Sequence, residues 1–180
     1  MRRAGPTRYE RKWDPRPLSG NRGVTFTDPF GLKDVDYTDA KTKAQVDEMR
    51  RKSKTFDNAI HRLEGDHSVL VRIGRGDTSP CGGSGGCTQY AGKNKAGQEE
   101  VDVTIHDGSI AADNNLLKDV GGMDALTTLA HEVYGHAHYY LTQGKVCLDG
   151  SPGTPANQSC SVRRENVIRR EMGYVRRTQY

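Results

Sequence analysis

The sequence lacks any apolar run long enough to cross a lipid bilayer, and its first residues, MRRAGPTRYERKW, lack the apolar segment of a secretory signal. Hydrophobic residues make up only 33% of the 180 residues, aromatic residues only 7%, and the mean hydropathy is -0.81. These shortages exclude a membrane-embedded protein and favour a soluble chain with long irregular segments. The length suits one domain with a core of its own and is hardly enough for two.

The chain also lacks a strong excess of either charge. Lys and Arg number 27 against 23 Asp and Glu, a formal net charge of +4, and the basic residues concentrate in Arg2–Arg16 and Arg163–Arg177. A diffuse basic balance of this kind is typical of a solvated face, or of a protein that contacts an acidic surface. We expect neither a membrane nor a nucleic acid as partner.

Apolar spacing divides the chain into a leader and one folded domain. Residues 1–32 have no periodic apolar pattern and predict a disordered leader, and residues 33–180 predict the domain. Within it, the spacing predicts one long helix over 39–63, strands at 67–73 and 101–105, a helix over 124–143 that Asp124 caps and Gly144 ends, and a helix over 161–173 that Ser161 caps. The predicted fold is α+β, with a long N-terminal helix, a small antiparallel sheet and two later helices that clasp a metal.

Four cysteines bracket two glycine-rich loops, CGGSGGC at 81–87 and CLDGSPGTPANQSC at 147–160. Neither spacing matches a structural zinc knuckle. Cys81 with Cys87, and Cys147 with Cys160, either form disulfides or remain free thiols, and disulfides persist only in oxidising compartments. The first pair lies in a long loop between the predicted strands, which is either functional or disordered.

The chemistry is concentrated on the 124–143 helix, where HEVYGH contains His131, Glu132 and His136. In the zinc-peptidase pattern HExxH, two histidines four residues apart share a zinc ion and the glutamate acts on the metal-bound water. Here the second histidine comes one residue later, about 140° from the first around a regular helix. A π-bulge restores the ligand geometry, and Gly135 tolerates that distortion best.

A third histidine on this helix, His138, is a weaker candidate for ligand. It lies about 10 Å from His131 along a regular helix axis, too far for both to bind one zinc ion directly. We expect it to face a carboxylate or the solvent. The plain alternative for the whole cluster is three histidines on an ordinary amphipathic helix, and the adjacency of Glu132 to His131 argues against it.

HEVYGH is similar to the HExxGH variant of the zinc motif in dipeptidyl peptidase III, whose helix accommodates an extra residue. The wider strings LAHEVYGHAHYYL and ENVIRREMG resemble metallopeptidase toxin domains at the C-termini of bacterial Rhs-type polymorphic toxins. FTDPFGL, at 26–32, resembles the DPxGL sequence that ends the Rhs core, although alone it is typical of a turn. The resemblance implies a zincin-like fold, bound Zn²⁺ and cleavage of the parent chain after Leu32. Residues 1–25 do not resemble an Rhs repeat, which indicates an orphan or truncated tip.

The same resemblance implies a biological setting. Such a toxin tip is made in the bacterial cytoplasm without a signal peptide of its own and is delivered into a target cell, for instance by type VI secretion. Its expected partners are a protein or peptide substrate, a cognate immunity protein, and an Rhs shell or another component of the secretion system.

A catalytic zinc needs a third protein ligand and an open position for water. In glutamate-type zincins that ligand comes from a helix after the motif helix, and the resemblance implies Glu165 for this role. The alternative for this residue is an i, i+4 ion pair with Arg169, which contributes only tenths of a kcal/mol. Glu171 is the reserve, as ligand or as the group that orients a ligand histidine. His106 and Asp107 are another source, although HDG is more often a turn.

The predicted activity is hydrolysis of peptide bonds by metal-activated water. Glu132 would take the water proton and pass it to the leaving amine. Tyr174, Arg176 and His138 are the candidates for stabilising the oxyanion, and the strand at 101–105 is a candidate to pair with an extended peptide. Two other functions stay open. A metal-dependent nuclease toxin would need phosphate-binding loops or carboxylate clusters, and a non-catalytic binding domain predicts no stoichiometric zinc.

Overall fold

The computed structural model describes residues 34–76, 81, 85–110, 121–122 and 124–180. In chain order, the elements are β1 (Val35–Tyr37), α1 (Ala40–Lys52), α2 (Lys54–Glu64), β2 (Val69–Arg75), β3 (Gly86–Lys93), β4 (Glu99–Ile105), α4 (Ala125–Leu129), η2 (Ala130–Ala137), α5 (His138–Gln143) and α6 (Cys160–Glu171). The predicted leader over 1–32 lies outside the described residues, as does the expected cleavage point after Leu32. Among the described helices, none is both long and apolar enough to cross a membrane.

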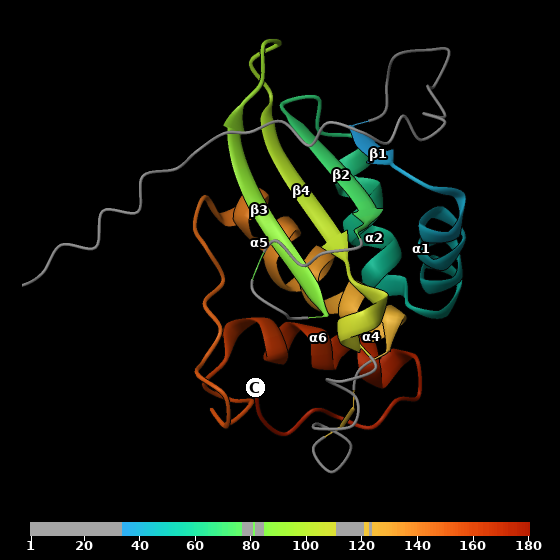
Figure 1. Cartoon of the computed structure of the whole chain (residues 1–180), viewed down its shortest axis with the longest axis vertical. Helices are drawn as coiled ribbons and strands as arrows, with labels where there is room; N and C mark the ends of the chain where they lie inside the picture. The colour runs from blue at the N-terminus through green and yellow to red at the C-terminus, as the bar shows by residue number, and fades with distance from the viewer. Residues whose placement is uncertain (1–33, 77–80, 82–84, 111–120, 123) are drawn as a thin grey trace, which may run out of the picture.

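The strands form one small mixed sheet in the order β1-β2-β4-β3 (Figure 1). β2 and β4 correspond to the two predicted strands, but they pair in parallel, with Val71 opposite Val101 and Ile73 opposite Val103. The predicted antiparallel sheet is therefore wrong for this pair, and only β3 runs antiparallel, along β4. β3 reverses the chain between β2 and β4, so β4 runs in the same direction as β2.

The position of β4 overturns the expectation that the strand at 101–105 pairs with a peptide. β4 is bonded to β2 on one side and to β3 on the other, so it has no free edge. The outer strand on that side is β3, whose sequence GCTQYAGK has little of the alternation that marks a half-buried strand. It forms inside the loop for which the sequence left two possibilities, functional or disordered, and its pairing with β4 stabilises it.

The long helix predicted over 39–63 is two helices, α1 and α2, which are separated at Ser53. This residue is extended, with φ -132° and ψ 111°, and its hydroxyl accepts a hydrogen bond from the amide of Phe56. The same hydroxyl donates to Glu171, at the end of α6, across 2.6 Å, and that carboxylate also accepts from the amide of Thr55. A serine cap and a carboxylate from the far end of the chain thus replace the bonds that would have continued α1.

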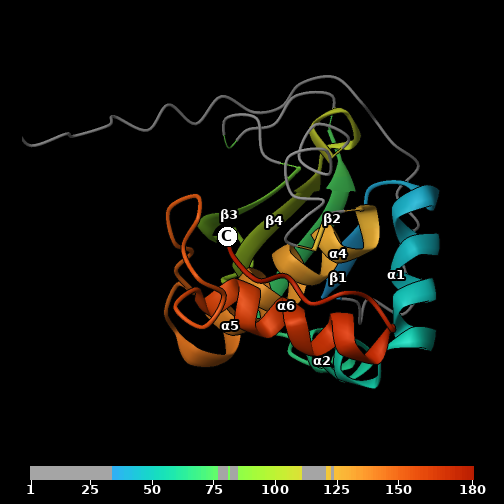
Figure 2. The same cartoon turned by 90° about the horizontal axis from the view of Figure 1, so that it is seen from below.

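Apolar side chains from the sheet and the helices meet in one core. The helices lie on one face of the sheet (Figures 1 and 2), and the helix that bears the HEVYGH motif contacts both β3 and β4. The buried apolar side chains of this core include Phe56, Ile60, Leu63, Val71, Ile73, Val101, Val103, Ile105, Leu129 and Val133. This packing holds the motif helix beneath β3 and β4.

α4, η2 and α5 follow one another without a break and form the helix predicted over 124–143. Asp124 caps it by accepting a hydrogen bond from the amide of Thr127, and Gly144, with φ 64°, ends it, as expected. The next helix, α6, has Ser159 as its cap rather than the predicted Ser161. These two helices carry most of the residues that the sequence singles out.

Candidate metal centre

The extra residue in HEVYGH is absorbed by a π-helix. η2 spans the whole motif, and each of its turns is wider than a turn of α-helix. The wider turn brings the Nε2 atoms of His131 and His136 within 3.3 Å of each other. The π-distortion that the five-residue spacing predicts is confirmed.

Gly135 has a packing role that the sequence did not indicate. A Cβ at this position would lie 3.2 Å from the Cβ of Ser161, closer than side chains normally pack. The glycine therefore allows η2 and α6 to approach each other closely. As a result, the first turns of α6 lie directly beside the two motif histidines.

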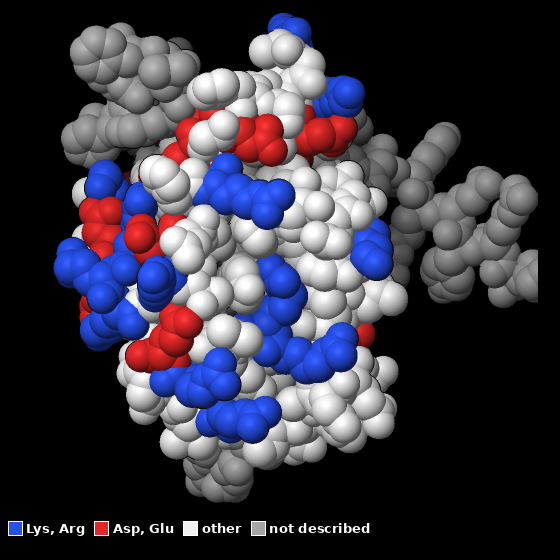
Figure 3. Space-filling model, turned by 180° about the vertical axis from the view of Figure 1, so that it is seen from behind, with Lys and Arg blue, Asp and Glu red and all other residues white. Residues whose placement is uncertain are grey.

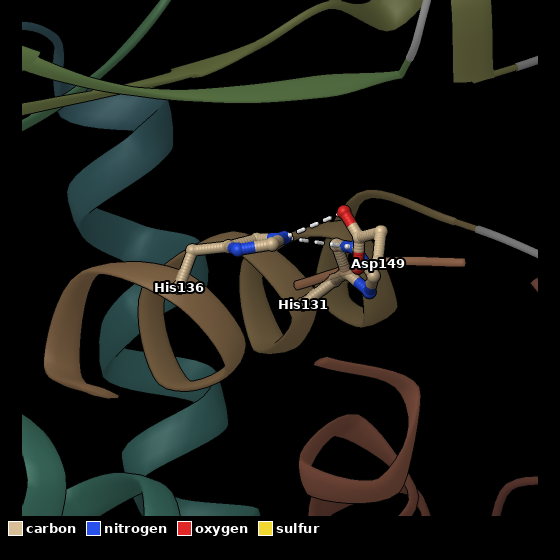
Figure 4. A group of neighbouring side chains, drawn as sticks. All are labelled: His131, His136 and Asp149. Atoms are coloured by element: carbon tan, nitrogen blue, oxygen red, sulfur yellow. Dashed lines mark hydrogen bonds and ion pairs between the residues drawn. The ribbon is translucent and has the colours of Figure 1, made fainter. Parts of the chain in front are cut away.

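Asp149 joins His131 and His136 in a group that could hold a metal ion (Figure 4). It comes from the segment between α5 and α6, and its Oδ2 is 3.0 Å from Nε2 of His136 while its Oδ1 is 3.6 Å from Nε2 of His131. Ligand atoms about 2.0–2.2 Å from a tetrahedral zinc ion lie roughly 3.3–3.6 Å from one another. The 3.3 Å between the two Nε2 atoms falls within that range. The Asp149 distances are to its two different oxygens, Oδ2 at 3.0 Å from His136 and Oδ1 at 3.6 Å from His131, so a small shift of the carboxylate would bring one oxygen to the same ion.

Glu165 lies on the opposite side of the His131 ring. Its Oε2 is 2.8 Å from Nδ1 of His131, whereas Nε2 of the same ring faces Asp149. The predicted role of Glu165 as third ligand does not agree with this geometry, and Asp149 stands in that position instead. The alternative ion pair with Arg169 is present, at 2.5 Å, and Arg177 adds a second cation at 3.3 Å.

The carboxylate of Glu165 is charged and orients His131. Burial alone would raise its pKa, but the hydrogen bond from His131 and the charges of His131, Arg169 and Arg177 lower the pKa to about 2. A charged carboxylate accepts the Nδ1–H of the neighbouring imidazole. In the neutral ring this selects the tautomer whose Nε2 lone pair is directed at Asp149 and His136.

Negative charge makes this group attractive to a cation. Burial lowers the pKa of His131, but hydrogen bonds to Asp149 and Glu165 outweigh burial and raise it to about 10. Burial raises the pKa of Asp149, yet its hydrogen bonds with His131 and His136 and their charges hold it well below its usual range. A group of side chains that binds a proton so firmly also favours a metal cation at the same place.

Glu132 lies beside the two histidines under β3. Its Oε2 accepts a hydrogen bond from the hydroxyl of Thr88 at 2.7 Å, and the residue is 6% exposed. A Cβ at Gly86 would come within 2.6 Å of Cγ of Glu132. The glycine therefore lets β3 pass directly over the motif helix, and β3 in turn fixes the glutamate.

A cavity of about 600 Å³ opens beside these residues. Its walls are β3, η2, the segment after α5 and the last residues of the chain, and they include Thr88, Tyr90, Glu132, Leu148, Asp149 and Tyr180. A cavity of this size is ample for one or two residues of a peptide or for another small ligand. The metal-binding group and the candidate base thus share one accessible space.

Tyr180 is a polar residue of this cavity that sequence reasoning missed. Its phenol is hydrogen-bonded to Asp149, and burial together with that carboxylate raises its pKa above the usual range. Its ring centre lies 6.0 Å from that of His131. The phenol therefore stays protonated beside the metal-binding group and can donate a hydrogen bond there.

The three residues predicted to stabilise an oxyanion lie elsewhere. Nδ1 of His138 is 3.0 Å from Arg164, and burial and the charge of Arg164 lower the pKa of His138 to about 4. Tyr174 is hydrogen-bonded to Asp124 at the start of the motif helix. Arg176 lines a separate small hollow beside α6. This arrangement does not support the predicted roles.

The reserve ligands also serve other parts of the structure. Glu171 holds the start of α2 through Ser53, as described above. His106 is hydrogen-bonded to Ser109 in the turn after β4, and Asp107 pairs with cations of α1 and β2. None of these candidates belongs to the metal-binding group.

Both cysteine pairs form disulfides, Cys81–Cys87 and Cys147–Cys160. Of the two possibilities that the sequence left open, the structure has the bridged one. The sequence did contain a signal that could have identified Asp149. This carboxylate lies two positions after Cys147, within the loop that the second disulfide closes. Read without the bridge, the string LDGSPG is typical only of a turn.

Comparison with known proteins identified no homologue. The chain matches no family model, no curated protein and no solved structure. The resemblances to dipeptidyl peptidase III and to Rhs-type toxins therefore remain expectations based on short strings. The residues around the cavity carry the functional interpretation.

Proposed function

We propose that this chain is a zinc-dependent metallopeptidase with a zincin-like fold. The observation that carries the proposal is the group of His131, His136 and Asp149, whose two Nε2 atoms lie 3.3 Å apart, beside the carboxylate of Glu132. Two imidazoles and one carboxylate are a ligand set typical of catalytic zinc, because they leave a fourth position for water or substrate. A purely structural zinc site would instead supply four protein ligands.

The residues divide the proposed reaction among them. His131, His136 and Asp149 hold the ion, which when bound polarises the scissile carbonyl and lowers the pKa of a coordinated water. Glu132 accepts a proton from the attacking water and delivers it to the leaving amine. The hydroxyl of Thr88 donates a hydrogen bond to Oε2 of Glu132, which leaves Oε1 to accept the proton.

Two further residues assist without holding the ion. Glu165 keeps His131 in the orientation that directs Nε2 at the ion. The phenol of Tyr180 faces the same cavity and is the donor best placed to stabilise the developing oxyanion. Tyr180 takes this role from the three candidates that the sequence suggested.

The outer edge of β3 is the proposed place for an extended peptide. In the described part of the sheet, β3 pairs only with β4, so a peptide could add to the other edge of β3 beyond Gly86. Thr88 and Tyr90 of this strand line the cavity. A peptide added as a further strand would therefore pass next to Glu132.

The toxin setting rests on sequence resemblance alone. We propose delivery into a target cell, by type VI secretion or a related route, together with a cognate immunity protein and an Rhs shell or secretion component. The chain's Lys and Arg side chains form several separate groups on the face shown in Figure 3, with acidic groups beside some of them. On this face, the distribution is typical of a solvated surface rather than of a nucleic-acid groove.

Zinc analysis of purified protein tests the proposal. We expect about one zinc ion per chain in the native protein, as for a single mononuclear site. His136→Ala and Asp149→Ala should lose the ion, whereas Glu132→Gln should keep the ion and lose peptide hydrolysis. His138→Ala is the matched control, because it removes a histidine of the same helix that lies outside the group, and it should retain zinc.

The pattern of losses separates the proposal from its rivals. Native protein without zinc would leave the binding-domain alternative, and zinc that survives both ligand substitutions would overturn the assigned ligands and with them the peptidase proposal. Cleavage of nucleic acid that depends on Mg²⁺ would establish the nuclease instead. Peptide hydrolysis that persists in Glu132→Gln would contradict the role given to this carboxylate.

A further inference from the structure

Both disulfides lie at the cavity, and one of them is next to a metal-binding side chain. Cys147 stands two positions before Asp149, and Cys160 is the first residue of α6. The bridge between them ties the segment that carries Asp149 to the helix that carries Glu165. A covalent bond therefore connects the two segments whose carboxylates approach His131 from its two sides.

Apolar packing does little to hold this segment. Cys147 is 1% exposed, whereas its neighbours Val146 and Leu148 are 46% and 72% exposed. Large apolar side chains that stay in contact with water contribute little to the stability of the segment that bears them. Cys147 is therefore the buried residue that fixes the chain between the end of α5 and Asp149.

Two hydrogen bonds extend the same attachment. The amide of Cys160 donates to the carbonyl of Leu148 at 3.1 Å, and the hydroxyl of Ser161 donates to Oδ1 of Asp149. Both donors belong to the first turn of α6, so both bonds require the segment to stay against that turn. Because Gly135 lets α6 pack closely on η2, this turn sets the distance from Asp149 to the histidines.

We infer that Cys147 and Cys160 are positioning residues of the proposed zinc site, which binds its ion tightly only while the two are joined. The inference rests on the proposed function, because it concerns the same ion. Reduction adds two electrons and two protons to the bridge and yields two thiols, and it leaves the segment that carries Asp149 attached to α6 by hydrogen bonds alone. The site then binds zinc weakly in a reducing cytosol and tightly in an oxidising compartment. The proposed peptidase would therefore be active on substrates outside the cytosol.

The Cys81–Cys87 bridge supplies a matched control. It borders the same cavity from the side of β3, and it holds no residue of the metal-binding group. The double variant Cys81→Ser/Cys87→Ser should keep the zinc affinity of the native protein. It also gives a background in which a reductant acts only on the Cys147–Cys160 bridge.

The experiment measures zinc affinity in this control background by competition with a chromophoric chelator. A water-soluble trialkylphosphine reduces the bridge, is itself oxidised to the phosphine oxide with oxygen from water, and is removed before the titration. We expect the affinity to fall about 10- to 100-fold on reduction, the size of loss typical when a group that orients a ligand is removed. Reoxidation should restore it. Adding Cys147→Ser/Cys160→Ser should reproduce the loss without reductant.

A double-mutant cycle with Asp149→Ala separates positioning from a general structural role. This variant should lose its zinc during purification, but the weak affinity for added zinc that the two histidines retain can be measured against a low-affinity chelator. If the bridge acts through Asp149, reduction should have little further effect on zinc affinity once that side chain is gone. An equal loss in the presence and absence of Asp149 would overturn the inference, as would an unchanged or increased affinity in the reduced protein. Far-UV circular dichroism checks that each form remains folded, and the reduced protein keeps the test available if the serine variant does not fold. Failure of the oxidised native protein to bind zinc would instead overturn the proposed function itself.

Discussion

Two regions of this molecule are held together in different ways. The region of α1, α2 and the sheet is closed by buried aliphatic and aromatic side chains, among them Phe56 and Ile60 at 0% exposure. The region around the cavity has the exposed apolar residues Val146 and Leu148, and its buried side chains include the charged group of Glu165, Arg169 and Arg177. Apolar contacts are not directional, whereas hydrogen bonds and disulfides are. The first region therefore supplies stability, and the second supplies the geometry that a metal ion requires.

The largest effect should come from opening the apolar core. Phe56→Ala removes a side chain with 0% exposure and should lower the free energy of unfolding by about 3–5 kcal/mol. Leu148→Ala, a truncation of a 72% exposed side chain at the cavity, should change it by no more than about 0.5 kcal/mol. Urea denaturation of the metal-free proteins measures both values. Equal losses would contradict the division between the two regions.

The next effect should come from neutralising Glu165. Glu165→Gln leaves the guanidinium groups of Arg169 and Arg177 buried without their carboxylate, which should cost about 3 kcal/mol of stability or somewhat more. It also replaces the charged acceptor of Nδ1–H of His131 by an amide oxygen, which accepts more weakly and can turn its NH2 group toward the ring instead, so zinc affinity should fall about 10- to 100-fold. Chelator competition and urea denaturation measure the two quantities on the same preparation.

Glu171→Gln is the control for this substitution. It neutralises another carboxylate of α6, one that contacts the start of α2 and not the metal-binding group. It should weaken the cap of α2 by about 1 kcal/mol and leave zinc affinity unchanged. Zinc affinity that falls equally in both variants would show that the charge of α6 matters, rather than the contact with His131.

A smaller effect is expected where the two regions meet. At Gly86, a Cβ would come within 2.6 Å of side-chain atoms of Glu132 and Thr128. Gly86→Ala should therefore push β3 away from the motif helix at a cost of about 1–3 kcal/mol. It should also displace Glu132 and reduce peptide hydrolysis while the zinc content stays near that of the native protein. Unchanged hydrolysis would contradict the role of β3 in fixing this glutamate.

Features that depend on neighbours in the sequence were predictable. The helix over 124–143, its cap at Asp124, its end at Gly144 and its π-turn all follow from short-range spacing, and the structure has each of them. β2 and β4 follow from alternating apolar residues in the same way. In such segments, the pattern of burial is written directly into successive residues.

Features that depend on distant residues were not predictable. The break at Ser53 requires Glu171, 118 positions later in the chain, and the direction of β4 depends on a strand hidden in a glycine-rich loop. Asp149 reaches the histidines through a disulfide and the first turn of α6. For Glu165, the resemblance to glutamate-type zincins implied a role as third metal ligand, and the sequence could not tell which ring nitrogen of His131 the carboxylate meets.

The smallest expected effect concerns an ion pair with the same spacing as that of Glu165 and Arg169. Lys43 and Asp47 are also four residues apart, at 2.6 Å, but their side chains are 43% and 39% exposed, against 3% and 0% for the buried pair. Lys43→Ala should change the free energy of unfolding by no more than about 0.5 kcal/mol, because water and salt screen an exposed pair. Arg169→Ala should cost about 3 kcal/mol or more, because it leaves a buried carboxylate without its nearest cation. Urea denaturation at low and high salt measures both. Similar losses would mean that i, i+4 spacing alone sets the strength of such pairs, whereas a large difference would assign it to burial, the property that separates the two regions.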